Sequence, residues 1–325
     1  MGLNMTMKEF SKTIENDARS KRDYWTSLDK MKMDYSGNLV NGNFRLKLND
    51  TAINQLANKT NAKGLALYAK TLRDRGQYAR LSSLFNYHIK DELKYRESLD
   101  KKSDMLIRSK DGICRAVLTN KYEIIDNESI KDILEKKLEN RDVSITNCKI
   151  DEDYMNVRIK FNDLEYNDGK SPLYPCIHVK NSEVGLSSLF ITAVLYRQIC
   201  SNGMVTQLKE GKTISKRHFS NQFVDELIDE SIIDCIDSVE HVIKPFLKTK
   251  EEKVEDPVST IEYLCNEQRL KKTFKDECVQ AYLVEKDKTK FGVINAFTRA
   301  AQTEDFSGER LKIEQFAGKL LHRKL

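Results

Sequence analysis

The chain contains 325 residues, of which 39% are hydrophobic and 32% charged, and its formal net charge is +5. This length suits one large domain or two modest ones, and the composition excludes a low-complexity or fully disordered chain. No run of residues approaches the roughly 18 apolar positions that a membrane span needs. The seven cysteines are dispersed and include no CxxC pair, which predicts reduced thiols in a cytoplasmic protein.

The first third of the chain predicts several helices, one strand and one hairpin. Residues 5–33 have the pattern of a charged helix, and we assign 1–42 to an N-terminal helical arm. Lys110-Asp111-Gly112 predicts the turn of a hairpin. The other expected elements are a strand at 44–48, helices after Asn49 or Asp50, at 62–74 and at 77–98, and a helix from Asp126 or Asn127 to about residue 140.

Residues 143–204 predict the core of an α+β fold. Apolar and polar residues alternate from Met155 to Phe161, which is typical of a strand with one buried and one solvated face. A strand that begins at Val143 precedes it, and a strand from Tyr174 to Lys180 follows it. Residues 184–201 are apolar around most of a helical circumference, so we expect a buried helix across the sheet. The expected unit is an antiparallel β-β-β-α core.

The last part of the chain predicts helices. Residues 223–246 combine an apolar stripe with an acidic opposite face, and residues 247–256 resemble an exposed linker. Asp256 followed by proline is a typical helix start. We therefore expect an α+β core domain at 43–246 and a helical C-terminal region at 257–325, in addition to the N-terminal arm.

The patterns that would indicate catalysis or metal binding are incomplete. Gly211-Lys212-Thr213 resembles the end of a phosphate-binding loop, but Thr206 stands where that loop needs glycine. The five histidines show no metal-ligand spacing. Asp153, Asp168 and Lys170 loosely match the spacing of a magnesium-dependent nuclease, although the last two lie in a predicted turn. The sequence therefore predicts no catalytic residue, no metal and no cofactor.

Basic residues gather on one side of the predicted strands, opposite the apolar side. Such residues neutralise phosphates and give salt-sensitive binding to nucleic acid without reading its sequence. The alternative is a charged face that only keeps the protein in solution, and the residues alone do not decide between the two. Four candidates lie on the strands and four would extend their track: Arg158, Lys160, His178 and Lys180, then Lys212, Lys216, Arg217 and Arg115.

Three segments carry a family resemblance: Arg115–Asn127, Asn181–Met204 and Phe291–Ala301. Together they resemble the phage/plasmid-like protein family known as domain of unknown function 932, over roughly residues 45 to 302. Phe291 departs from the tryptophan that we expect the family to carry there. The family name implies no activity, but the resemblance implies a mobile-element, phage-type origin and a bacterial host cytoplasm.

The expected element order adds a second resemblance. Three strands followed by a helix that is entered through Glu183-Val184-Gly185 are similar to the core of recombination annealing proteins of the Rad, RecT and Erf kind. That resemblance implies rings or filaments that hold single-stranded DNA in a basic groove beside the sheet.

These observations support three hypotheses. The first is a single-stranded-DNA-binding, strand-annealing protein that acts as a homo-oligomer and consumes neither metal nor nucleotide. The second is a non-enzymatic anti-defence or host-interaction protein that docks through the acidic helix at 223–240. The third is a magnesium-dependent nuclease that uses Asp153, Asp168 and Lys170.

Overall fold

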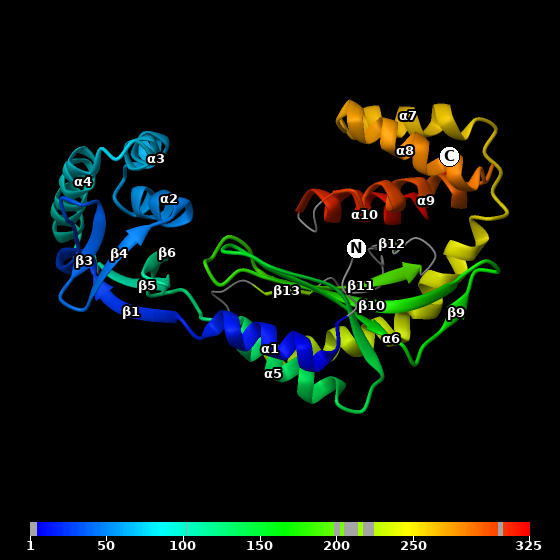
Figure 1. Ribbon diagram of the computed structural model, residues 1–325, viewed down its shortest axis with the longest axis horizontal. Coiled ribbons are helices and arrows are strands. Elements are labelled where there is room, and N and C mark those ends of the chain that lie inside the picture. The colour runs from blue at the N-terminus through cyan, green and yellow to red at the C-terminus, as the bar shows by residue number, and fades with distance from the viewer. Residues whose placement is uncertain (1–4, 102, 198–201, 205–213, 217–223, 305–307) are drawn as a thin grey trace.

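The computed structural model of the protein describes residues 5–101, 103–197, 202–204, 214–216, 224–304 and 308–325. Two sheets and two helical groups form an open crescent (Figure 1). The first lobe stands at one end of the larger sheet and the C-terminal helices stand at the other end, on the same side of that sheet. The α+β class predicted from the sequence is confirmed.

The first lobe contains a six-stranded sheet covered by helices α2, α3 and α4 (Figure 1). Asn49 caps α2 by accepting a hydrogen bond from the Ala52 amide, as the sequence predicts. Asp111 and Gly112 both take positive φ angles in the β5–β6 turn, which is the predicted hairpin. The elements are β1 Lys21–Ser27, β2 Lys32–Met33, β3 Asn38–Asn41, β4 Phe44–Leu48, α2 Asp50–Lys59, α3 Ala66–Asp74, α4 Tyr78–Ser98, β5 Asp104–Lys110 and β6 Ile113–Thr119.

The second sheet is antiparallel, with strand order β12-β11-β10-β8-β7. The short strand β13 pairs with β11, and β9 pairs with β10. Three helices, α1, α5 and α6, lie on one side of it (Figure 1). The elements are α1 Met7–Ala18, α5 Asn127–Leu138, β7 Val143–Ile150, β8 Met155–Phe161, β9 Tyr166–Asn167, β10 Pro172–Asn181, β11 Leu189–Arg197, β12 Asn202–Met204, β13 Ile214–Lys216 and α6 Val224–Lys248.

The face of the second sheet that packs on α1, α5 and α6 is the core face. Val157, Ile159 and Ile177 are fully buried there against Phe10 and Ile228 of the helices. Burying each such side chain stabilises the fold by about 1.5–3 kcal/mol before entropy is subtracted. The apolar half of the predicted alternation therefore faces the core.

The C-terminal residues fold as four helices over the opposite face of the second sheet (Figure 1). Their own core is continuous with the end of α6 through Phe246, whose ring centre lies 5.0 Å from that of Phe291 in a tilted arrangement. Residues between α6 and α7 are not a free linker, because Val254 is buried and Lys250 pairs with Asp168. The helices are α7 Pro257–Glu267, α8 Lys272–Glu285, α9 Lys290–Ala300 and α10 Gly308–Leu320.

Two element predictions are wrong. The predicted helix at 184–201 is instead the strand β11, which pairs with β10 from Phe190 to Arg197. It is apolar all round because α6 covers one side of it and the other side is also largely buried, and periodicity does not separate such a strand from a buried helix. The predicted helix at 5–33 ends at Ala18, and Lys21–Ser27 joins the first sheet as β1. The N-terminal arm is therefore only partly helical.

Candidate nucleic-acid interface

The face of the second sheet opposite the core face is defined by Lys149, Arg158, Lys160, His178 and Lys180, and we call it the cationic face. The register places these residues on one side, because Lys149 and Lys180 both pair with Asn156, while Arg158 pairs with His178. Among the described strand residues of β7, β8, β10 and β11, no carboxylate shares this face. The strands themselves therefore contribute only positive charge to this face.

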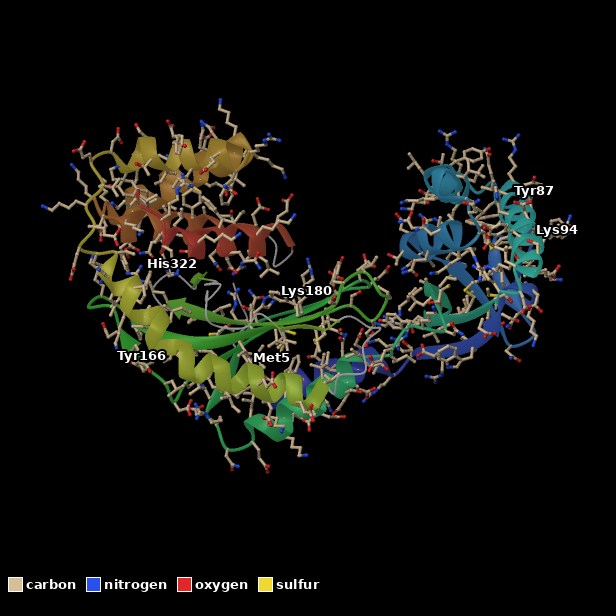
Figure 2. The ribbon with its side chains drawn as sticks, turned by 180° about the vertical axis from the view of Figure 1, so that it is seen from behind. Met5, Tyr87, Lys94, Tyr166, Lys180 and His322 are labelled. Carbon is tan, nitrogen blue, oxygen red and sulfur yellow. The ribbon has the colours of Figure 1, made fainter. Side chains whose placement is uncertain are left out.

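Lys180 lies at the end of the cationic face that is nearer the first lobe, and Figure 2 labels it there. Its Nζ is 4.4 Å from the centre of the Tyr154 ring, and Phe190 is its partner on β11. Partial burial lowers the pKa of Lys180. The negative charge of Asp151 opposes this shift, and the positive charge of Lys312 on α10 adds to it. A half-buried lysine between two accessible aromatic rings suits a phosphate beside stacked bases.

Lys160 lies four positions away in the register, at the other end of the cationic face. Its Nζ is 4.3 Å from the ring centre of Tyr174 and 5.8 Å from that of Tyr196. The Tyr174 hydroxyl donates to the Glu165 carboxylate over 2.7 Å, and this bond is the main cause that raises the pKa of Tyr174 to about 12. The two nearly buried tyrosines hold Lys160 in place rather than offer stacking surfaces.

A buried ion network occupies the middle of the cationic face. Arg158 is 1% exposed, and its Nη2 lies 2.5 Å from Oε2 of the fully buried Glu314 on α10. Arg310 donates to the same carboxylate over 3.1 Å. The pKa of His178 lies well below its usual range, mainly because the ring is buried. The positive charges of Arg158, Lys180 and Arg310 lower it further. The expected solvated face is therefore wrong here, because α10 covers Arg158 and His178.

The predicted contact Arg115 belongs to a different buried cluster, between the two lobes. Its guanidinium donates twice to the Glu183 carboxylate at 3.2 Å, and the Lys21 ammonium lies 2.7 Å from it. The Asn127 amide donates to the same side chain over 3.0 Å. Arg108 donates to the Glu183 carbonyl and forms ion pairs with Asp23 and Asp126. The segment that begins at Asn181 therefore joins the lobes, and Arg115 is not an exposed contact.

The three further candidates are Lys212, Lys216 and Arg217. Lys212 and Arg217 are outside the described residues. The backbone of Lys216 pairs with Leu189, which places the residue on the outer edge of β11.

The nuclease hypothesis requires two carboxylates to meet, and the fold separates them. Asp153 lies in the β7–β8 turn, next to the Asn181 end of β10, whereas Asp168 precedes the Pro172 end. Ten residues of strand separate these ends by about 30 Å. Asp168 accepts hydrogen bonds from the Lys170 and Ser171 amides and pairs with Arg197 over 2.6 Å, so it is a structural turn residue. Within the described ranges no group of three or more His, Cys, Asp or Glu side chains could hold a metal.

The acidic helix is partly neutralised within the molecule. Lys137 of α5 lies 2.5 Å from Asp229 and 3.7 Å from Asp225, both near the start of α6. Glu226 and Glu230 are exposed on the same helix. The described part of this face therefore offers less free negative charge than its sequence indicates.

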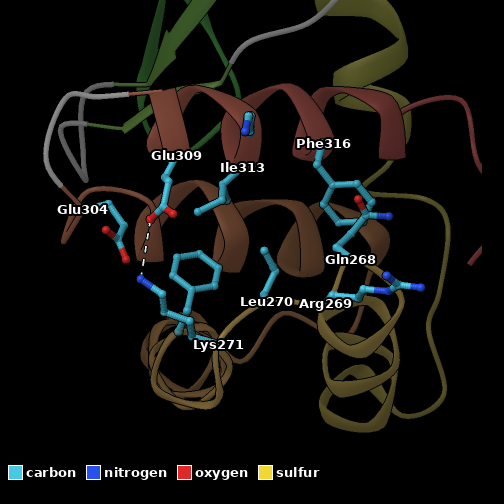
Figure 3. A pocket seen from close by; sticks show the side chains of 10 residues that line it. Gln268, Arg269, Leu270, Lys271, Glu304, Glu309, Ile313 and Phe316 are labelled. Carbon is cyan, nitrogen blue, oxygen red and sulfur yellow. Dashed lines mark ion pairs between the residues drawn. The ribbon is translucent and has the colours of Figure 1, made fainter. Parts of the chain in front are cut away.

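A cavity of about 270 Å³ lies between α10 and the α7–α8 turn (Figure 3). Phe274, Ile313 and Phe316 form its apolar wall. Glu309 points toward Lys271, at 3.7 Å, so the rim carries both signs of charge (Figure 3). A polyanion is therefore better matched by the cationic face than by this cavity.

Several residues of the interface were missed by the sequence interpretation. Tyr154, Phe190 and Lys149 share the cationic face, and Lys312 approaches it from α10. Tyr174, which lies beside Lys160, was missed as well. The alternation that identified Lys180 also places Tyr174 on the same side of β10, so the sequence contained the signal for this residue. Lys312 had no such signal, because it comes from a helix distant in the sequence.

The comparisons with known proteins give one match. The family described as domain of unknown function (DUF932) matches residues 116–311, from β6 to the first turn of α10. No curated protein and no solved structure matches the chain. In the described part of the chain, every helix is too short or too polar to cross a membrane.

Proposed function

The chain belongs to the domain of unknown function (DUF932) family, and we propose that it binds single-stranded DNA along the cationic face. The observation that carries this proposal is the arrangement of Lys160 and Lys180, each beside aromatic rings, on a strand face that bears no described carboxylate. Their positions on the sheet differ by four residues along β10, which is about 13 Å. The phosphate backbone would contact these two lysines on either side of Arg158 and His178, which α10 covers.

Stacking adds to the electrostatic attraction at the Lys180 end. Tyr154 and Phe190 are both partly exposed there, and each base stacked on an aromatic side chain contributes about 1–3 kcal/mol. Arg158 and His178 lie between the two lysines and take no direct part, because α10 covers them. The binding is then salt-sensitive and tolerant of sequence.

Strand annealing by a homo-oligomer in a bacterial host cytoplasm, encoded by a phage or plasmid, extends this proposal. Its support is the pairing of lysines with aromatic rings, because lysines that hold phosphates and rings that stack bases would leave the base edges free for a second strand. The expected similarity of element order to annealing proteins does not include β11, which is a strand where that order has a helix. Light scattering of the protein with and without an oligonucleotide tests the assembly, and fluorescence-monitored annealing of complementary strands tests the activity.

The direct test is fluorescence anisotropy of a labelled oligo-dT strand. Lys160→Glu and Lys180→Glu should each weaken binding at low salt by roughly tenfold or more, and reduce the slope of log affinity against log salt by about one. Lys272→Glu is the matched control, since Lys272 is an exposed lysine at the start of α8. Equal binding by all four proteins rules the proposal out. Arg158→Glu is unsuitable, because it would place two carboxylates together under α10.

The second candidate function is a host-interaction protein. The exposed Glu226 and Glu230, together with the 54% exposed Ile233, give α6 a small acidic and apolar surface. Capture of one host protein that survives nuclease treatment and is lost in Glu230→Lys would favour this candidate over DNA binding.

A further inference from the structure

A cavity of about 420 Å³ lies between the two lobes, where the β10–β11 loop meets the first lobe. Its polar lining comes from Gln55, Asn58 and Lys59 of α2 and from Ser187 and Ser188 of the loop. Val117, Leu118, Tyr122 and Leu186 supply an apolar side. Clefts between lobes that combine an apolar wall with a few convergent polar groups are typical ligand sites.

The cavity is held open by defined contacts rather than by loose packing. Gln55 donates to the Val184 carbonyl over 2.7 Å and accepts from the Val117 amide over 2.8 Å, so it ties the loop to the first lobe. Gly185 has a positive φ of 75°, and a Cβ there would lie 2.9 Å from Leu118. The loop therefore sits against the lobe in a fixed way.

The charge of the cavity is positive and lacks a balancing carboxylate. Lys59 is the one charged residue in the described lining, and within the described residues no ion pair reaches it. Arg96 of α4 donates to the Lys59 carbonyl, which places a guanidinium that is itself paired with Glu92 beside the site. Burial and the charge of Arg96 lower the pKa of Lys59, so a bound anion would relieve both effects.

Hydrogen-bond donors accompany this charge. The Ser187 hydroxyl is buried and has no partner in the described structure. The Asn58 side chain is exposed at the same opening. The cavity thus combines the Lys59 ammonium, serine hydroxyls and the Asn58 amide with an apolar wall. This combination suits a phosphate joined to a nucleoside better than it suits a cation or a neutral sugar.

We infer that this interlobe cavity binds the phosphate of a nucleotide through Lys59, with Ser187 and Asn58 as further donors. The phosphate belongs either to a free nucleotide or to a DNA strand that continues from Lys180, since Lys180 is the penultimate residue of β10, shortly before this loop. Both sources share the same chemistry at Lys59. The site does not depend on DNA binding at the cationic face.

The test uses the full chain, with inorganic phosphate, dTMP and thymidine as probes in calorimetric titration and thermal melting. Phosphate and dTMP should bind and raise the Tm, whereas thymidine should not. Lys59→Met should weaken dTMP binding by roughly tenfold or more, and Lys59→Arg should keep most of it. Without any anion, Lys59→Met should melt at or above the temperature of the natural chain, because the repulsion from Arg96 is removed; this control shows that the variant folds.

A 5′-phosphorylated oligo-dT separates the two sources. If Lys59→Met leaves oligonucleotide binding unchanged while dTMP binding is lost, the ligand is a free nucleotide. If oligonucleotide binding falls as well, the phosphate is that of a strand. The inference is overturned if none of these anions binds the natural chain, or if Lys59→Met binds dTMP as the natural chain does. Lys180→Glu should leave the binding of phosphate and dTMP unchanged while it weakens oligonucleotide binding, so failure here is distinguishable from failure at the cationic face.

Discussion

At the residue scale, Glu183 connects parts of the chain that lie far apart in the sequence. Its 4% exposed carboxylate accepts from Lys21, Arg115 and the Asn127 amide. Glu183→Gln removes the carboxylate that pairs with the buried Arg115 and leaves Lys21 with Asp17 alone, which should lower the free energy of unfolding by about 3 kcal/mol. Urea denaturation measures this, with the exposed Glu128→Gln as control. A loss as small as that of the control would contradict the structural role of Glu183.

The pH dependence of this loss has a defined sign. Burial raises the pKa of Glu183, but Lys21, Arg115 and the hydrogen bonds outweigh it, and the pKa lies below the usual value of 4.5. A lowered pKa in the folded state contributes stability above about pH 4.5 and loses it as the pH falls through the folded value. The stability difference between the natural chain and Glu183→Gln should therefore shrink below pH 4.5. A constant difference down to pH 3 would contradict the charge assignment.

Residue identities predicted one part of the candidate site and missed another. The alternation along β8 and β10 placed Arg158, Lys160, His178 and Lys180 on one face, and the register confirms that placement. Alternation carries no information about what covers a face. Arg158 is buried because Glu314, 156 positions later, lies above it, and only the fold brings these two residues together.

At the element scale, the C-terminal helices attach to the second sheet through Phe291. Its fully buried ring lies 5.0 Å from the Arg197 guanidinium of β11 and 4.5 Å from the Lys250 ammonium. Phe291→Ala should cost about 3–5 kcal/mol, because it opens a cavity and removes both cation–ring contacts. Urea denaturation checks this, with the 89% exposed Tyr35→Ala as control. A cost below about 1 kcal/mol would show that this attachment matters little.

The element that sequence reasoning assigned wrongly also lies on this sheet. Residues 189–197 contain Ile191, Thr192 and Val194, which are β-branched, together with the aromatic Phe190 and Tyr196. That composition favours a strand, but the continuous apolar pattern resembled a buried helix. The ambiguity arises because both sides of β11 are largely buried, so alternation disappears from the sequence. The amphipathic helices α2, α5 and α6 kept one wet side and were therefore predictable.

At the scale of the whole molecule, charge is distributed unevenly along the crescent. Residues 19–126, which include the first lobe, contain 22 Lys and Arg against 13 Asp and Glu, a net charge of 22 − 13 = +9, whereas the whole chain carries +5. The remaining residues are therefore net acidic, and the described acids of α6 lie on the far side of the second sheet from the cationic face. If the proposed DNA strand binds at the cationic face, it would be drawn toward the first lobe and away from α6.

Photo-cross-linking of a 4-thiothymidine oligonucleotide, mapped by mass spectrometry, tests the central claim most directly. The cationic face predicts cross-links at Tyr154 and Phe190, which flank Lys180, and their loss in Lys180→Glu. Additional cross-links are expected on the first lobe near Lys59 if the strand continues into the interlobe cavity. Cross-links confined to α6 or to the C-terminal helices, with none between residues 154 and 197, would contradict the account.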